Sequence, residues 1–454
     1  MTTTYDFGKE KIIMPTETRS MLLNVGPSHP AMHGVIRLIM ELDGEKIKDV
    51  DVEIGYLHRA FEKMCETVMY AQCFPYADRL NYVSPLINNV GFALTVEKLL
   101  GIDIPERAKY IRVLMSEISR VTDHLTCIGA SAMELGAMTV FLYMIKAREF
   151  LYELVEEITG ARLTISYVRI GGVKADLTPG FAEKAFKKIA EVRKVLIEAD
   201  QLLTRNRIFF DRMKDIGIIS AQDAIAYGIT GPFLRGSGVA YDVRKANPYL
   251  IYDRLDFEVP TGTKGDNLDR YFVRMAEMEQ SLRMIEQCFQ QIPEGPVSGI
   301  LTGDVIPAAQ MVDKAKMGET KGLIEEQVDL DPTLQGGTKK YYAGINADKK
   351  DVVLPAKEET YSNIEGLMNH FKLVMYGHGI RPPVGEAYFP VEGANGELGF
   401  YIVSDGADHP WRVRVHPPCF PIMAALPKCL VGDMMADLVP TFGSVNMIAG
   451  ELDR

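Results

Sequence analysis

The segment PERAKYIRVLMSEISRVTDHL, which runs from Pro105 to Leu125, carries the pattern that decides the fold. Its apolar residues follow the spacing i, i+3, i+4, i+7, which places them on one face of an α-helix. They are Ile111, Leu114, Met115, Ile118, Val121 and Leu125. Pro105 suits the first turn of that helix. Similar stripes recur from Met144 to Ile158 and from Met275 to Phe289. Such stripes face a core, so the sequence predicts the walls of a long-helix bundle.

Antiparallel strands are expected on both sides of this bundle in the sequence. Met21 to Gly55 alternates apolar and charged residues around the turn signal Asp43-Gly44. A second hairpin should pair Gly385 to Phe389 with Leu398 to Val403 through Asn395-Gly396. The predicted fold class is therefore α+β, a long-helix bundle with flanking antiparallel β elements.

The chain has 454 residues, which exceeds the usual size of a single core and predicts one large elaborated domain or two closely packed ones. Changes in composition divide it into four regions. They are an N-terminal β region (1–58), a helical core with ordered loops (59–300), a polar surface insertion (301–357), and a C-terminal helix, hairpin and docked apolar tail (358–454).

Composition excludes several classes of function. The net charge of −11 argues against a nucleic-acid surface, because phosphate neutralisation needs clustered lysine and arginine. The sequence contains no Walker A, GxGxxG, GxSxG or HExxH motif. None of its 6 cysteines belongs to a CxxC pair, which argues against a redox or metal motif of that kind and fits a reducing compartment.

The most membrane-like stretch runs from Ile128 to Ile145 and contains Glu134. A spanning helix needs about 20 apolar residues, and a charge near its centre costs roughly 2.5 kcal/mol or more. We therefore expect a buried helix in a bundle here, and no transmembrane helix. The N-terminus also lacks the apolar region of a secretory signal.

The segment NVGPSHPAMHG, from Asn24 to Gly34, holds His29 and His33. Histidines at this spacing can share a metal on one helical face. Its glycines and prolines break any helix, however, which favours a loop and disfavours zinc binding. Imidazoles in such a loop suit hydrogen bonding or proton transfer, although a structural role for one of them remains an alternative.

The segment CFPYADRLNYVSP, from Cys73 to Pro85, places Tyr76, Asp78, Arg79 and Tyr82 at the junction of two helical stretches. Tyrosines in such positions are usually half-buried packing residues with a satisfied hydroxyl group. The segment alone therefore assigns none of them a catalytic role.

Together these two segments resemble the 49-kDa or D subunit of respiratory complex I, a relative of nickel–iron hydrogenase large subunits. The resemblance covers nearly the whole chain, in order. It continues through Ile54 to Arg59, Val96 to Leu100, Tyr110 to Leu114, Gly171 to Val173, Leu234 to Gly238, Asp269 to Tyr271, Gln280 to Arg283, His370 to Leu373, Gly396 to Gly399, Val403 to Gly406 and Leu452 to Arg454.

The resemblance implies a hydrogenase large-subunit-like fold and a core peripheral-arm subunit of an NADH:quinone oxidoreductase. This subunit would form the quinone-headgroup site with a partner that carries the terminal iron–sulfur cluster, and quinone reduction would be coupled to proton translocation. It implies no cofactor bound by this chain, quinone as substrate, and iron–sulfur and membrane-arm subunits as partners. The expected location is peripheral, on the cytoplasmic face of the inner membrane, and the chain alone should be inactive.

The matching positions imply that His33 and Tyr82 contact the quinone carbonyl oxygens, with His29 supporting the pocket. Quinone reduction consumes two electrons and two protons, and a phenol and an imidazole can both donate hydrogen bonds and protons. Arg59 matches an arginine near the partner's cluster, where a cation favours the arrival of electrons. A plain structural alternative is that Arg59 pairs with Glu62.

The sequence departs from its relatives in two respects. Hydrogenases hold nickel and iron with two CxxC pairs, whereas only Cys73 remains here and 440–454 lacks cysteine. Hydrogen activation is therefore excluded on ligand count. Glu134 stands where the family has an aspartate beside the quinone-site histidine. We hypothesise that Glu134 stabilises protonated His33 by its opposite charge.

Two other functions stay open at this stage. One is a non-catalytic scaffold subunit of a ferredoxin- or deazaflavin-fed membrane oxidoreductase complex. The other is a quinone-reducing relative of complex I that takes electrons from such a donor, which the sequence does not distinguish from an NADH-fed enzyme. A scaffold has no need of both His33 and Tyr82, so this pair favours a catalytic subunit.

Overall fold

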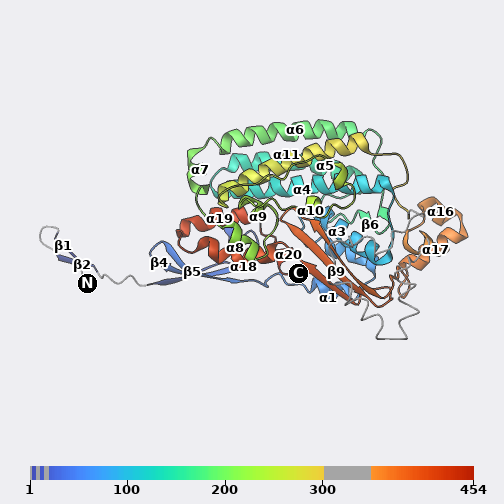
Figure 1. Ribbon diagram of the computed structural model, residues 1–454, viewed down its shortest axis with the longest axis horizontal. Coiled ribbons are helices and arrows are strands. Elements are labelled where there is room, and N and C mark those ends of the chain that lie inside the picture. The colour runs from blue at the N-terminus through green and yellow to red at the C-terminus, as the bar shows by residue number, and fades with distance from the viewer. Residues whose placement is uncertain (1–2, 7–10, 15–19, 301–348) are drawn as a thin grey trace.

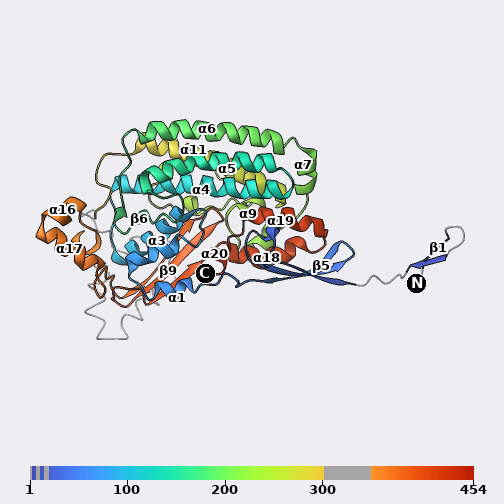
Figure 2. The same cartoon turned by 180° about the vertical axis from the view of Figure 1, so that it is seen from behind.

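A computed structural model describes residues 3–6, 11–14, 20–300 and 349–454 of the chain. Its largest part is a layer of long helices, which Figures 1 and 2 show from opposite sides. The long helices are α3 (Pro85–Leu100), α4 (Glu106–Glu134), α5 (Met138–Thr159), α6 (Phe181–Leu203) and α11 (Asn267–Gln291). Helix α4 lies at the centre, because it packs against α3, α5 and α11, while α6 packs against α5 and α11.

Two three-stranded antiparallel sheets lie on the other side of α4. The first has the order β3 (Met21–Val25), β4 (Arg37–Asp43), β5 (Lys46–Glu53). The second has the order β10 (Arg412–His416), β9 (Glu397–Ser404), β8 (Gly385–Glu392). Both predicted hairpins are present, and the predicted α+β class is confirmed.

The remaining elements are short. Two further strand pairs are β1 (Thr3–Asp6) with β2 (Lys11–Met14), and β6 (Val168–Arg169) with β7 (Gly172–Val173). The short helices before the insertion are η1 (Pro30–Met32), α1 (Phe61–Cys65), η2 (Tyr70–Cys73), α2 (Phe74–Ala77), α7 (Arg207–Met213), α8 (Ala221–Ala226), α9 (Gly231–Gly236), α10 (Val243–Ala246) and η3 (Tyr252–Arg254). Those after it are α15 (Lys349–Val352), α16 (Lys357–Ser362), α17 (Ile364–Val374), α18 (Cys419–Leu430), η4 (Met435–Asp437), α19 (Leu438–Val445) and α20 (Ala449–Leu452).

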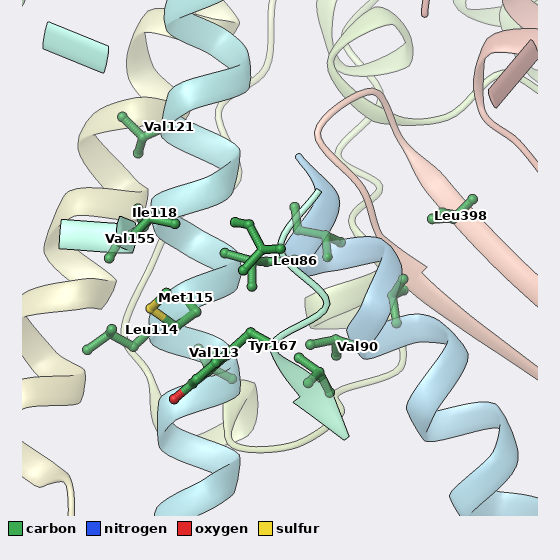
Figure 3. Packing of buried hydrophobic residues seen from close by; sticks show 14 of the residues in the cluster. Leu86, Val90, Val113, Leu114, Met115, Ile118, Val121, Val155, Tyr167 and Leu398 are labelled. Carbon is green, nitrogen blue, oxygen red and sulfur yellow. The ribbon is translucent and has the colours of Figure 1, made fainter. Parts of the chain in front are cut away.

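The predicted stripe on α4 forms the centre of the main hydrophobic core. All of its residues, from Ile111 to Leu125, are buried. Figure 3 shows Val113, Met115 and Ile118 of α4 beside Leu86 and Val90, which belong to α3. A second core lies between the β3–β5 sheet and the C-terminal helices α18 and α19.

The apolar stretch Ile128 to Ile145 differs from the single buried helix that its composition suggested. Helix α4 ends at Glu134 and α5 begins at Met138, so the stretch is divided between two antiparallel helices. Gly136 adopts a φ of +88° in the connection, where a glycine carries no steric penalty. In the described part of the chain, none of the helices combines the length and hydrophobicity that spanning a membrane requires.

The predicted polar insertion 301–357 lies mostly outside the described residues. Its last part contains α15, and Val352 and Val353 there are buried. The helix predicted before the C-terminal hairpin is present as α17, and the apolar tail after Pro417 forms α18, α19 and α20, which are largely buried.

The polar face of α4 is also buried, which the apolar stripe alone did not predict. Glu117 lies at its middle and accepts hydrogen bonds from Tyr252 (2.7 Å) and Ser281 (2.7 Å). Arg120 and Arg244 each approach the same carboxylate to 3.2 Å. Burial by itself raises the pKa of Glu117, but these two guanidinium groups outweigh it and bring the pKa to about 2. Glu117 is therefore ionised inside the protein and ties α4 to the loops that cover it.

Replacement of Glu117 by alanine should destabilise the chain by about 3–5 kcal/mol, because Arg120 and Arg244 would remain buried without their carboxylate. The matched control is Glu153→Ala on α5, which removes an exposed ion pair with Lys188 (2.7 Å) and should cost about 1 kcal/mol or less. Proteolysis of the assembled protein over a urea series measures both. Equal losses in the two variants would contradict the proposed importance of the buried charges.

Candidate functional site

The loop between β3 and β4 presents His33 toward the end of α4. His29 caps the short helix η1, because its Nδ1 accepts a hydrogen bond from the Ala31 backbone N–H (3.2 Å). His33 follows η1 with a φ of 46°, in the left-handed region that few non-glycine residues adopt. The two histidines therefore differ in position: His29 is exposed and stabilises the loop, whereas His33 points inward.

His33 contacts Glu134, the last residue of α4. The Nε2 atom lies 2.8 Å from Glu134 Oε1, so the glutamate reaches the imidazole. The contact lacks the alignment of a hydrogen bond, since Nε2 and Glu134 Oε2 have no hydrogen-bond partner among the described residues. Phe442 meets the ring edge-on, with centroids 6.2 Å apart. Nε2 is thus held beside a carboxylate with its hydrogen-bonding capacity unused.

Tyr82 lies a few residues before α3 and is 38% exposed. Burial of its inner side raises the pKa of the phenol, and the nearby Asp123 and Cys419 raise it further, whereas Arg59 opposes them. The hydroxyl group therefore keeps its proton at neutral pH and returns to the protonated form readily after losing it.

Behind Tyr82 lies a group of buried polar side chains that we term the inner polar cluster. Its members are Asn81, Asp123, Asn395, Cys419, Asn446 and Glu451. Asp123 is its centre: its two carboxylate oxygens accept hydrogen bonds from Asn81 (3.0 Å) and Asn446 (2.7 Å). Only the position of Asn81 beside Tyr82 hinted at this cluster in the sequence, because the other members come from distant segments.

The His33 and Tyr82 regions share one face of α4. Asp123 and Glu134 are eleven positions apart, which is close to three full turns and roughly 16 Å along the axis. The end of α19 joins them, because Asn446 bonds Asp123 while Gly443 packs on Glu134. A Cβ atom at Gly443 would lie 3.0 Å from Glu134 Oε2, so this close packing favours glycine.

Arg59 is exposed, and its Nη2 donates to the carbonyl of Arg79 (3.1 Å). Glu62, the alternative partner suggested by the sequence, instead lies within 4.0 Å of Arg412, Arg414 and Arg454. The structure thus leaves the guanidinium of Arg59 close to Tyr82 and to the surface.

Cys73, the remnant of the hydrogenase cysteines, is buried and contacts the carbonyls of Cys65 and Met69 through its thiol (3.6 Å each). Burial raises its thiol pKa well above the usual value, so it resembles a small apolar residue more than a reactive thiolate. A cavity of about 660 Å³ lies among Phe74, Arg169 and Val353, and its lining includes neither His33 nor Tyr82.

The family described as "Respiratory-chain NADH dehydrogenase, 49 Kd subunit" matches residues 134–454. The chain belongs to this family. It is 50% identical over 440 residues to the NADH-quinone oxidoreductase D 2 subunit of Anaeromyxobacter sp. (strain Fw109-5), an alignment that covers 97% of this chain and 90% of the relative. It is 48% identical over 450 residues to the corresponding D 1 subunit of Sorangium cellulosum (strain So ce56), covering 99% and 98% respectively. The family resemblance seen in the sequence is confirmed.

A third relative differs in its domain content. The C/D subunit of NADH-quinone oxidoreductase from Bdellovibrio bacteriovorus is 46% identical over 432 residues, which cover 95% of this chain but 68% of the relative. In that protein a further segment is joined to the part that matches this chain.

Proposed function

We propose that this chain is the subunit of a complex I-type NADH:quinone oxidoreductase that forms the quinone-headgroup site, together with a neighbour that carries the terminal iron–sulfur cluster. The observation that carries this proposal is the presentation of His33 and Tyr82 from one face of α4. Each is only partly buried and lies near a carboxylate of that helix. A scaffold would gain nothing from two such groups.

The two side chains match the chemistry of quinone reduction. A quinone needs two electrons and two protons, and its carbonyl oxygens accept hydrogen bonds. The Tyr82 hydroxyl and the His33 Nε2 are donors at opposite ends of the site, and each can transfer its proton as the oxygen becomes charged. The electrons come from the partner's cluster, and the positive charge of Arg59 near Tyr82 favours their arrival.

Partners and location follow from the family. The longer relative from Bdellovibrio supports a neighbouring peripheral-arm subunit that is fused to this one in some organisms. We further propose a peripheral position on the cytoplasmic face of the membrane, contact with membrane-arm subunits, and coupling of quinone reduction to proton translocation. The central bundle with flanking sheets supports descent from nickel–iron hydrogenase large subunits.

Tyr82→Phe and His33→Ala should each lower NADH:quinone turnover in membranes by an order of magnitude or more, because each removes one proton donor to the quinone. Reduction of a hydrophilic artificial acceptor by NADH in the same membranes checks that the complex is assembled. Tyr227→Phe and His378→Ala, which alter an exposed tyrosine and an exposed histidine, are the matched controls. Unchanged turnover in an assembled complex would favour the scaffold function instead.

Glu134→Gln should move the pH profile of quinone reduction toward acid. A neutral amide no longer stabilises the protonated imidazole of His33, so proton donation is confined to lower pH. Steady-state rates from about pH 5.5 to 9 measure the shift, a range that brackets the ordinary pKa of histidine. Glu153→Gln, on an exposed face of α5, should leave the profile in place. A profile that coincides with the wild type in Glu134→Gln would show that this carboxylate does not act on His33.

A further inference from the structure

Glu451 is a buried acid that the chemistry at Tyr82 and His33 leaves without a role. It lies in α20, near the C-terminal end of the sequence, and is 1% exposed. Its Oε1 accepts a hydrogen bond from the Cys419 backbone N–H (3.3 Å). Within 20–300 and 349–454, neither Glu451 nor Asp123 forms an ion pair with a lysine or arginine, although both belong to the inner polar cluster.

Two buried carboxyl groups in one cluster without a cation do not both ionise easily, because each charge opposes the other in a medium of low dielectric constant. Asp123 accepts two amide hydrogen bonds, which favour its charged form. Glu451 has no comparable set of donors. Burial, followed by the nearby Asp123, raises the pKa of Glu451 to about 7. The cluster therefore stores one exchangeable proton near neutral pH, and Glu451 is the group that holds it.

Contacts connect Glu451 to Tyr82. Asn395 donates to the Cys419 thiol (3.6 Å) and accepts from Asn446 (2.5 Å), which in turn bonds Asp123. Both Cys419 and Asp123 lie close enough to Tyr82 to raise the pKa of its hydroxyl group.

The approach of the two segments is built into the backbone. Gly450 packs against the residues just before Tyr82, and a Cβ atom there would lie 2.6 Å from the carbonyl oxygens of Arg79 and Leu80. Only glycine allows α20 to lie this close to the tyrosine segment, and the next residue is Glu451.

We propose that Glu451 is the positioning acid that reloads Tyr82 with a proton after the tyrosine has protonated the quinone. This inference rests on the proposed function. In the step, the O–H bond of the Glu451 carboxyl group breaks and the O–H bond of the Tyr82 phenol re-forms, through the inner polar cluster. The charge moves from the phenolate to the Glu451 carboxylate, no electrons are exchanged, and the carboxylate regains its proton from solvent.

The test compares quinone turnover of the assembled wild-type and Glu451→Gln complexes from pH 6 to 9. The wild-type rate should exceed the variant rate at least tenfold at pH 6, because the amide holds no transferable proton. The ratio should fall through a pH of about 7 and approach 1 at pH 9, where the wild-type acid is itself ionised. A structural role predicts a ratio that does not change with pH, and that result would overturn the proposal.

Two further variants make the outcome decisive. Glu451→Asp keeps an ionisable carboxyl group and should recover at least half of the lost rate at pH 6. Glu451→Gln in a Tyr82→Phe background should be no more than twofold slower than Tyr82→Phe alone, since both changes act on one proton. Multiplicative losses in the double variant, or failure of both Glu451 variants to assemble, would overturn the proposal. Glu198→Gln, on the exposed side of α6, is the control.

The design separates this inference from the proposed function. Loss of turnover in Tyr82→Phe with normal, wild-type-like turnover in Glu451→Gln would refute the role of Glu451 alone. Normal turnover in both would refute the quinone site itself.

Discussion

The buried ionic network on the polar face of α4 is the constraint on which the rest of the structure depends. Glu117 is shared by Arg120 and Arg244, and Arg235 bridges Glu277 (2.6 Å) and Glu392 (2.9 Å) at no solvent exposure. Charges removed from water in this way are tolerated only when each finds its partner, so they penalise any other arrangement of the surrounding loops. The network therefore specifies how β8, α9, α10 and α11 meet α4 more than it adds to the net free energy of folding.

Because α4 is fixed on all sides, its C-terminal half is a rigid support for the candidate site. Asp123 and Glu134 lie on one face of this half, and each is contacted by the end of α19. Side chains carried by helices are held more narrowly than those on loops. His33 and Tyr82 come from loops, but each approaches a carboxylate whose position the bundle determines. The core thus sets the spacing of the two donors, while the loops leave them open to a ligand.

The sequence predicted the elements well and their buried chemistry poorly. Apolar periodicity located α4, α5 and α11, and turn residues located both hairpins, because these signals are local. The division of the apolar stretch at Gly136 was missed, since hydrophobicity does not report direction. The family resemblance supplied His33, Tyr82 and Glu134. The inner polar cluster escaped prediction because Asp123, Asn395 and Glu451 meet only in the folded chain, and no spacing in the sequence relates them.

The carboxyl groups around the candidate site differ in ways that assign them different tasks. Glu134 lies beside a histidine at the edge of the protein, where its charge is balanced whenever the imidazole is protonated. Glu451 is fully buried with no cation, so the neutral acid is its favoured form. Environments that separate two titratable groups in this way also separate their roles. A carboxylate that tunes an exposed donor and an acid that holds a proton in reserve together suit a reaction that consumes two protons per turnover. The protonic part of the site is therefore contained in this chain, and the electronic part is left to its partner.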